Sequence, residues 1–497
     1  MVRRTVLCLG LLLLAGSAWD VALAQSRKTT DLIKLLSDKN PKTRQSAAAD
    51  VAELAVVKLA EAQYALPALR DLARKDAETP VRLAALDAIG KIEPERHTAT
   101  LIDAVKKDKE PEFRLAVVAE LGKLGPRAKA SLPVLHDILK NPPEVAKTPP
   151  KTPKTPPPAG TPDPYEPQAL RKAIVPVLRL IDPASKDHLP LFLDVLKKDK
   201  DPGLRTVVVN AIAQQGPGVA KETLPGLQEA WKAALQEASK APAPPANPAV
   251  PVDPHGLLRQ TLLTAIGVMT PPPEEYLPLL TDALKKDREP AVKFTAATAV
   301  ARLGPSAKMA LPALLDAYKT SVALNPAADP QGARKAMLEA VGKLDKEPKT
   351  LLPVLSDVLK KDHDPAVLLV ALIEVARIGP GAKATLPLLR EVHRQALVLA
   401  PMTDASGVRK AAIDAVLKVD PEPKTHAALW LDVLQKDRDP ELRRNAVLAL
   451  AKLGPAAKPA TATLAEIARA GKLSTNEIDR GLAQDAETAL KAIKDAK

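Results

Sequence analysis

The chain has 497 residues, more than one hydrophobic core of ordinary size can organise, and 46% of them are hydrophobic. Only 2% are aromatic and the 50 prolines far exceed the 21 glycines, so Ala, Leu and Val supply the apolar surface and favour helices over sheets. The formal net charge is +13, and the single cysteine, Cys8, excludes a disulfide framework and a site built from several thiolates.

The first residues have the pattern of a secretory signal peptide. Two arginines precede an apolar run (residues 6–18), and an A-x-A cleavage pattern follows at 22–24. The run is short for a bilayer span, although an uncleaved anchor is the alternative. We therefore expect residues 1–24 to be removed and residues 25–497 to be exported, to the periplasm or the exterior. No later segment is expected to cross a membrane.

One short pattern, Asp-x-(Asp/Glu/Asn)-Pro, recurs along the rest of the chain. It begins at residues 38, 108, 199, 287, 362 and 437. An amphipathic segment ending in lysines precedes most of these turns, and an apolar segment of helical period, often ending at Gly-Pro, follows. The acidic residue before the proline is expected to cap the second helix, with proline in its first position. Gly-Pro is expected to end that helix.

Related helical segments lie between these turns, as at residues 333–362 and 408–437. Each interval therefore holds two helix pairs. The sequence predicts six double units, or about twelve helix pairs, stacked as a solenoid.

These features resemble the HEAT-repeat family. The matching patterns are Leu-Pro in the first helix, D-x-D/E-P-x-x-R at the turn, and A-V…A-L…L-G in the second helix. The resemblance covers about residues 29–495 and implies an all-α, HEAT/armadillo-like α-solenoid whose second helices line its inner face. HEAT arrays serve many unrelated roles, so the resemblance specifies the fold and leaves the function open.

Most even-numbered pairs carry an insert where the odd-numbered pairs have the four-residue turn. The inserts are expected at residues 141–167, 240–255, 323–331 and 400–407, and the first two are rich in proline, which cannot build a core. The Asp-x-x-Pro turns and the inserts are connections of one parity, so they should share one edge of the array. This edge either binds a partner, with Tyr165 as an anchor, or carries tolerated loop variation.

A base recurs near the start of the second helices. The even pairs have Arg82, Arg171, Arg259, Arg334 and Arg409, and the odd pairs have Arg44, Arg114, Arg205, Lys293 and Arg443, with Leu368 interrupting the series. Two interpretations stay open. Arg171, Arg259, Arg334 and Arg409 could form a positive stripe for an acidic partner. Alternatively, as the resemblance to HEAT proteins implies, the bases pair with the turn acids within and between repeats.

The chain shows no pattern for catalysis, for a cofactor or for a metal ion. Its seven histidines have neither HExxH nor His-x-His spacing, and a base or histidine separates the turn acids, unlike a calcium loop. A P-loop, a dinucleotide loop and a nucleophile elbow are also missing from the sequence. We therefore expect no catalytic, cofactor-binding or metal-binding residues.

The function that these observations favour is an exported, non-catalytic protein–protein interaction scaffold with an unknown partner. One alternative is a binder of an anionic envelope polymer through a basic face. The other is an accessory subunit of an exported enzyme system. Nucleic acid is not expected as a partner in that compartment.

Overall fold

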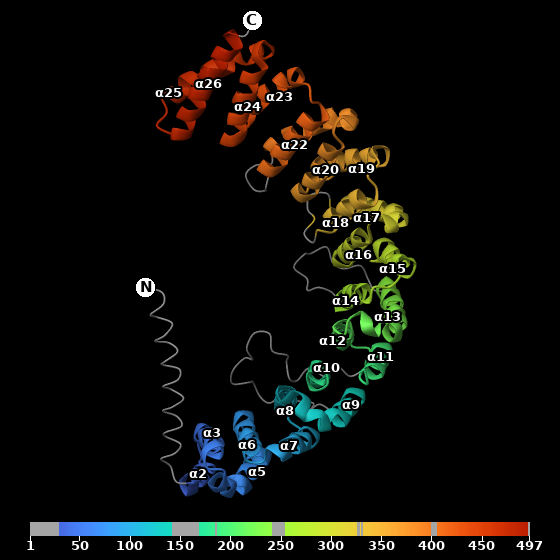
Figure 1. The fold of residues 1–497 in the computed structure, drawn as a ribbon, viewed down its shortest axis with the longest axis vertical. Coiled ribbons are helices and arrows are strands. Elements are labelled where there is room, and N and C mark those ends of the chain that lie inside the picture. Colours follow the sequence, from blue (N-terminus) through green and yellow to red (C-terminus); the bar gives the residue numbers. More distant parts are fainter. Residues whose placement is uncertain are drawn as a thin grey trace. The chain divides into compact units, whose positions relative to one another are not determined.

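The computed structural model describes residues 29–141, 168–183, 186–240, 254–325, 329, 332–398 and 405–495. Every regular element in these ranges is an α-helix or a 3-10 helix (Figure 1). The chain divides into two compact units, Met1–Ala230 and Trp231–Lys497. The expected signal peptide, residues 1–24, and Tyr165 lie outside the described residues.

Unit 1 is built from successive helix pairs. Its α-helices are α2 (Thr29–Leu35), α3 (Pro41–Val57), α4 (Leu59–Ala62), α5 (Leu66–Lys75), α6 (Thr79–Ile92), α7 (Pro94–Lys107), α8 (Pro111–Leu124), α9 (Leu132–Lys140), α10 (Ala169–Ile181), α11 (Leu189–Lys198), α12 (Pro202–Ala213) and the first part of α13 (Ala220–Lys240). Short 3-10 helices join them: η1 (Gln63–Ala65), η2 (Gly125–Ser131) and η3 (Pro217–Val219). The second helices α3, α6, α8, α10 and α12 contact one another in that order and form one layer.

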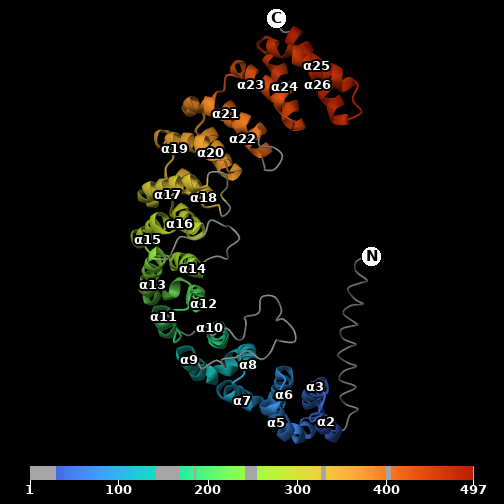
Figure 2. The ribbon, with the colours of Figure 1, turned by 180° about the vertical axis from the view of Figure 1, so that it is seen from behind.

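Unit 2 repeats this arrangement. After α13 come α14 (Pro254–Val268), α15 (Pro273–Lys286), α16 (Pro290–Leu303), α17 (Leu311–Leu324), α18 (Ala333–Leu344), α19 (Pro348–Lys361), α20 (Pro365–Ile378), α21 (Leu386–Val398), α22 (Ala405–Val419), α23 (Ala427–Lys436), α24 (Pro440–Leu453), α25 (Thr461–Lys472) and α26 (Glu477–Asp495). Its 3-10 helices are η4 (Gly304–Ala310), η5 (Gly379–Thr385), η6 (Pro423–His426) and η7 (Gly454–Ala460). The second helices α14 to α22 contact their neighbours, as do α24 and α26 (Figure 2).

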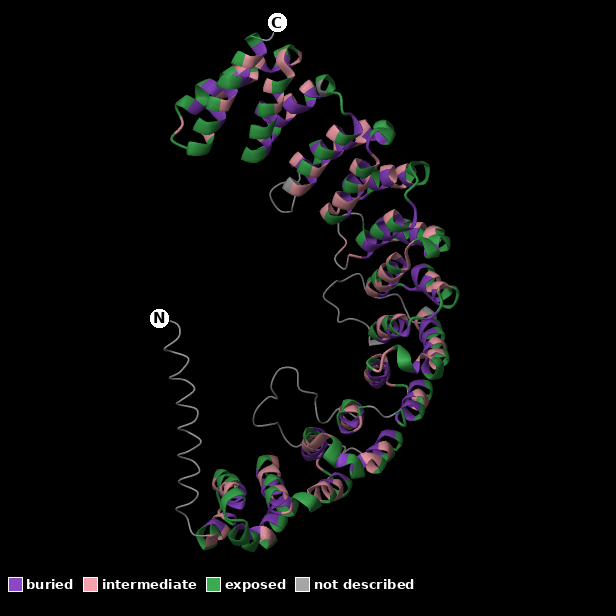
Figure 3. Cartoon of the chain, viewed as in Figure 1, coloured by how far each residue is buried: buried purple, intermediate pink, exposed green. Residues whose placement is uncertain are grey.

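The described helices form twelve successive pairs, from α2/α3 and α5/α6 to α25/α26. This confirms the predicted all-α solenoid of about twelve pairs. Apolar side chains are buried where the helices meet, and the exposed residues lie on the remaining faces of the helices (Figure 3). The burial pattern is what helices with one apolar stripe produce when they stack in two layers.

The acidic turns form as their sequence predicts, with two exceptions. The side chains of Asp201, Asp364 and Asp439 accept hydrogen bonds from N–H groups in the first turn of α12, α20 and α24, and a proline begins each helix. Glu110 and Glu289 stand at the same place before α8 and α16, but their side chains make no cap. The longer glutamate side chain is not among the preferred N-caps, so the motif caps through aspartate or, before α3, through an asparagine.

The Gly-Pro segments do more than end the second helices. Gly304 and Gly379 adopt φ values of +62° and +66°, which favour glycine. A seven-residue 3-10 helix then leads into the next first helix. The second helix is thus joined to the next pair by an ordered segment.

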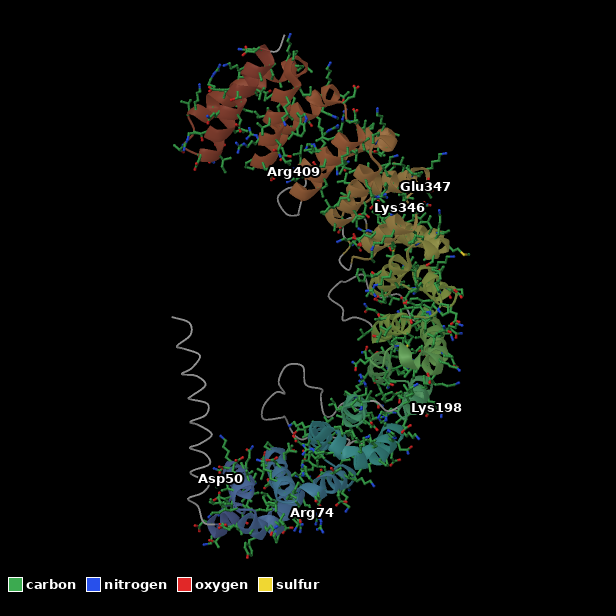
Figure 4. The ribbon with its side chains drawn as sticks, viewed as in Figure 1. Asp50, Arg74, Lys198, Lys346, Glu347 and Arg409 are labelled. Atoms are coloured by element: carbon green, nitrogen blue, oxygen red, sulfur yellow. The ribbon has the colours of Figure 1, made fainter. Side chains whose placement is uncertain are left out.

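The expected edges need a correction. Residues 345–348 also read Asp-x-Glu-Pro, yet they connect α18 to α19, on the edge of the Gly-Pro segments (Figure 4). The Asp345 carboxylate accepts a hydrogen bond from the Glu347 N–H, as the other turn aspartates do two residues on. The motif therefore specifies how a helix begins and does not specify which edge it occupies.

The predicted insert boundaries are also too wide in three places. α13 continues to Lys240 and α14 begins at Pro254, α17 continues to Leu324, and α22 begins at Ala405. Helical periodicity at the ends of these elements therefore extends into the predicted inserts. Most of the remaining insert residues lie outside the described ranges.

One stretch, Pro365–Leu397, is long and apolar enough to cross a membrane by length and composition alone. We expect from the sequence no segment after the predicted signal peptide to be long and apolar enough to cross a membrane, and this stretch corrects that expectation by length and composition. In the structure the stretch comprises α20, η5 and most of α21, with Gly379 at positive φ between the two α-helices. Both helices pack against α22.

Candidate functional site

The regularly placed arginines lie inside the array and pair with turn aspartates. In the even pairs of the second half of the chain, each arginine reaches an aspartate 28 residues further on. The Nε–Oδ2 distances are 2.6 Å for Arg259–Asp287, 2.9 Å for Arg334–Asp362 and 2.9 Å for Arg409–Asp437. Arg171 pairs with Asp199 in the same register. The arginine of one pair therefore clamps the turn of the next pair.

Geometry and burial make these pairs strong structural contacts. Arg259 and Arg334 each bind both carboxylate oxygens of their aspartate, the bidentate arrangement that a guanidinium favours. The two arginines are 2% exposed. Such pairs leave almost no guanidinium surface for an external partner.

The four predicted partner-binding arginines are therefore all buried, including Arg409, labelled in Figure 4. The structure supports the alternative interpretation, in which bases and turn acids pair between repeats. A direct role of these arginines in partner binding stays a prediction, and the burial of their side chains argues against it. Tyr165, the fifth predicted residue, lies outside the described ranges.

The other bases of the series are used less uniformly. The Arg44 guanidinium binds both oxygens of Asp76 and lowers the pKa of that carboxyl. Arg82 pairs with Asp108, and its guanidinium carbon lies 3.5 Å from the centre of the Phe113 ring.

Bases of the odd pairs are also buried, as Arg114 and Lys293 show. Arg114 donates to the Val105 carbonyl at 3.1 Å, and burial lowers its pKa. Burial likewise lowers the pKa of Lys293. At the place of Leu368 an apolar side chain is simply buried.

Additional groups complete two of the buried pairs. The Tyr318 hydroxyl donates to Asp362 at 2.9 Å, and burial followed by the charge of Asp362 raises the pKa of Tyr318. Burial acts to raise the pKa of Asp437, but the contacts with His393, with a backbone N–H and with Arg409 outweigh it and lower that pKa. These networks hold neighbouring pairs together.

The described residues contain no group of three or more His, Cys, Asp or Glu side chains that could hold a metal ion. One histidine pair does occur in unit 1. His136 on α9 and His188 before α11 approach to 2.9 Å between Nε2 and Nδ1, with the rings edge to face. Burial lowers the pKa of both, so the pair is neutral near neutral pH.

Two exposed features of unit 2 were not identified from the sequence. The first is a series of apolar side chains on the second helices: Phe294, Ile373 and Leu448 are 40%, 54% and 44% exposed. The second is a set of exposed bases on the connections between pairs. The signal for the first was available, because apolar residues stand five places after Leu368 and Arg443, whereas acids stand five places after Arg334 and Arg409.

The comparisons with known proteins agree with this fold. The HEAT repeats family matches residues 66–148 and 249–328. No curated protein sequence matches the chain.

Solved structures match over most of the chain at low identity. A mutant of Kap121p is 13% identical, with a TM-score of 0.50 over 94% of this chain and 49% of its own. Kap121p bound to Pho4p is 13% identical, with a TM-score of 0.49 over 94% of this chain and 50% of its own. Importin beta is 14% identical, with a TM-score of 0.37 over 94% of this chain and 74% of its own.

The chain thus spans about half the length of the Kap121p chains. At these identities the likeness concerns the fold alone. Together with twelve described helix pairs, the family match shows that the chain is an all-α solenoid carrying HEAT repeats in the two matched ranges.

Proposed function

We propose that the chain is an exported, non-catalytic scaffold that binds protein partners through the second helices of unit 2. The observation that carries this proposal is an exposed surface of mixed character. We define it as the second-helix face, formed by Phe294, Glu339, Ile373, Asp414 and Leu448.

The repeat register places four of these residues in one row. Glu339 stands five residues after Arg334, and Asp414 stands five residues after Arg409. Ile373 and Leu448 occupy the same position on the odd helices α20 and α24. The contacts of α18 with α20 and of α20 with α22 bring Glu339, Ile373 and Asp414 into consecutive positions, so charged and apolar side chains alternate over these three helices.

Phe294 extends this surface at the start of the row. Its ring lies against the position of Gly332 at the beginning of α18, where an added Cβ would be 3.8 Å from it. The exposed apolar side chains can anchor a partner, while the acids between them restrict which partner fits. HEAT-repeat solenoids generally mediate protein–protein interactions, which supports the same function.

The test uses the chain from residue 25 immobilised and exposed to native envelope extract. One variant carries Ile373→Asp and Leu448→Asp. The matched control carries Met309→Asp, because Met309 is 85% exposed on η4, away from the second-helix face. We expect a discrete protein that survives high salt and is recovered by the wild type and the control only. Equal recovery by all three chains would reject this face as the site.

Two further outcomes bear on the proposal. Recovery of one enzyme in stoichiometric amount would identify the scaffold as an accessory subunit. Recovery of no protein at all would refute the scaffold. Export is tested separately by N-terminal sequencing of the protein recovered from cells, for which we expect a mature chain beginning at Gln25.

A further inference from the structure

The connections between helix pairs in unit 2 share an arrangement of charge that the proposed scaffold function does not use. Five consecutive connections each include a seven-residue segment that begins and ends with a base. The segments are RLGPSAK (302–308), KLDKEPK (343–349), RIGPGAK (377–383), KVDPEPK (418–424) and KLGPAAK (452–458). All five follow a second helix, so they lie along one edge, which we call the basic edge.

The basic edge carries a large excess of positive charge. Its exposed bases are Arg302, Lys308, Lys343, Lys346, Lys349, Arg377, Lys383, Lys418, Lys424, Lys452 and Lys458. The same segments contain four acids, Asp345, Glu347, Asp420 and Glu422. Asp345 and Asp420 are 4% and 8% exposed. All eleven bases are therefore presented to solvent, whereas two of the four acids are buried and two, Glu347 and Glu422, are exposed.

The two buried acids are committed to local contacts. Asp345 accepts from the Glu347 N–H at 3.0 Å and lies 3.3 Å from Lys308 Nζ. Asp420 accepts from the Thr425 hydroxyl at 2.6 Å, and that hydrogen bond, which outweighs burial, lowers the pKa of Asp420. Their charges hold the starts of α19 and η6 and compensate only part of the edge.

Few bases of this edge are paired. Among the described residues, Lys308 pairs with Asp345, and Arg377 pairs with Glu374 at 2.7 Å. In unit 1 the corresponding edge is more evenly paired, with ion pairs Lys58–Glu61, Arg70–Glu93, Lys129–Asp182 and Lys186–Glu222. The excess is thus a property of unit 2.

Helix dipoles do not account for all of these bases. A base at the end of a second helix, such as Lys343 or Lys452, complements the negative end of the helix dipole. Lys349 lies in the first turn of α19, where the dipole is positive. The other bases that close the segments lie in the last turns of η4, η5, η6 and η7, the short 3-10 helices that lead into first helices: Lys308, Lys383, Lys424 and Lys458. These 3-10 helices contain too few peptide units to sum to a large dipole, so the recurrence of bases there and at Lys349 points to an external anion.

We propose that the basic edge of unit 2 binds a linear anionic polysaccharide. Nine of its eleven bases are lysines, compact point charges that suit repeated single charges along a polymer. The five segments contain no aromatic residue, so they offer no platform for stacked nucleic-acid bases. They also lack the aromatic anchors that dominate protein interfaces. Neighbouring helices pack about 8–10 Å apart, so consecutive segments can follow one extended chain.

Binding is measured with size-defined polygalacturonate and the chain from residue 25, over a series of salt concentrations. The edge variant carries Lys349→Gln, Lys424→Gln and Lys458→Gln. The matched control carries Lys285→Gln, Lys360→Gln and Lys436→Gln, exposed lysines at the ends of first helices, on the opposite edge. Both variants lose the same formal charge.

We expect the edge variant to bind about tenfold more weakly at low salt, because three solvent-exposed ionic contacts are lost. The control should bind within about twofold of the wild type, and the salt dependence should become shallower only in the edge variant. Thermal unfolding checks that both variants are folded. If both variants bind polygalacturonate equally weakly, the loss of affinity comes from net charge alone, and the proposal is overturned.

Two competitor polymers test the class of ligand. Polyglutamate and polyphosphate of matched charge should displace polygalacturonate less effectively than unlabelled polygalacturonate does. If polyglutamate displaces it better, the edge binds acidic protein, and if polyphosphate does, it binds a phosphate polymer. Either result refutes the polysaccharide assignment. The Ile373→Asp, Leu448→Asp variant should bind the polymer normally, which separates this proposal from the scaffold function.

Discussion

Replacing Asp362 by alanine tests whether the buried arginine pairs hold the helix pairs together. Asp362 is 1% exposed and receives both Nε and an Nη of Arg334, at 2.9 and 3.1 Å. It also accepts from the Tyr318 hydroxyl and from the N–H of Asp364. The substitution therefore removes the carboxylate that neutralises the buried Arg334 guanidinium and that accepts from the Tyr318 hydroxyl, and leaves the guanidinium with the Asn325 carbonyl.

The expected cost follows from this geometry. Removing one member of a buried ion pair typically costs about 3–5 kcal/mol, because the remaining charge is desolvated without compensation. A variant that removes both charges, Arg334→Met with Asp362→Leu, should recover most of that loss. The unsatisfied Tyr318 hydroxyl would still cost about 1–3 kcal/mol.

Urea unfolding followed by tryptophan fluorescence is the appropriate assay. Trp231 and Trp430 both belong to unit 2, and the only other tryptophan lies within the expected signal peptide. The control is Lys361→Ala, which removes a surface pair with Asp357 in which the two side chains are 61% and 34% exposed. We expect that control to cost less than about 1 kcal/mol. If Asp362→Ala costs no more than Lys361→Ala, the buried arginine–aspartate contacts are not what holds neighbouring helix pairs together.

Two further predictions concern unit 1 and the connections. Burial lowers the pKa of His97, His136 and His188 below the ordinary histidine value of 6.5. As the pH falls, these histidines therefore take up protons in the unfolded chain before they do so in the folded chain. Their contribution to the stability of unit 1 is complete above about pH 6.5 and is lost as the pH drops below it. Amide hydrogen exchange in α9 and α11 at about pH 7.5 and about pH 5.5 measures this, and equal protection at both would contradict it. Gly304→Ala should destabilise unit 2 by about 1–2 kcal/mol because φ is +62° there, whereas Gly481→Ala, in α26 with open space around it, should be neutral or stabilising by up to about 1 kcal/mol in the same urea assay. Equal effects of the two glycine substitutions would show that backbone conformation is not the cause.

Local signals in the sequence were sufficient to predict the helix pairs. A proline after an acid, a run of helical period and a Gly-Pro end each act within a few residues, so the twelve pairs could be expected without a structure. The same locality explains the misplaced turn at Asp345. The motif determines how α19 begins, and the edge on which α19 begins depends on the count of preceding helices, which a local motif does not contain.

The burial of the arginines depended on information of longer range. Arg259 and its acceptor Asp287 are 28 residues apart, on helices of successive pairs, and only their three-dimensional register brings them to 2.6 Å. From the sequence, an arginine at the start of an amphipathic helix fits a surface stripe as well as a buried clamp. The aromatic partner of Arg82, Phe113, was hidden for the same reason.

The two edges of unit 2 use charge in opposite ways, and this difference separates structural from functional bases. On the acidic-turn edge, the aspartates that pair with Arg259, Arg334 and Arg409 are neutralised within the fold, and removing one partner should destabilise the unit. On the basic edge, Lys424 and Lys458 are exposed, and no ion pair involves them among the described residues. Neutralising bases that stabilise the fold should lower the unfolding free energy. Neutralising bases that bind a ligand should leave it unchanged or raise it, because mutual repulsion is relieved. Measuring the stability of the Lys349→Gln, Lys424→Gln, Lys458→Gln chain beside its affinity for polygalacturonate therefore distinguishes the two roles: weaker binding with unchanged or higher stability assigns the edge to a ligand, and a loss of stability shows that these bases stabilise the fold.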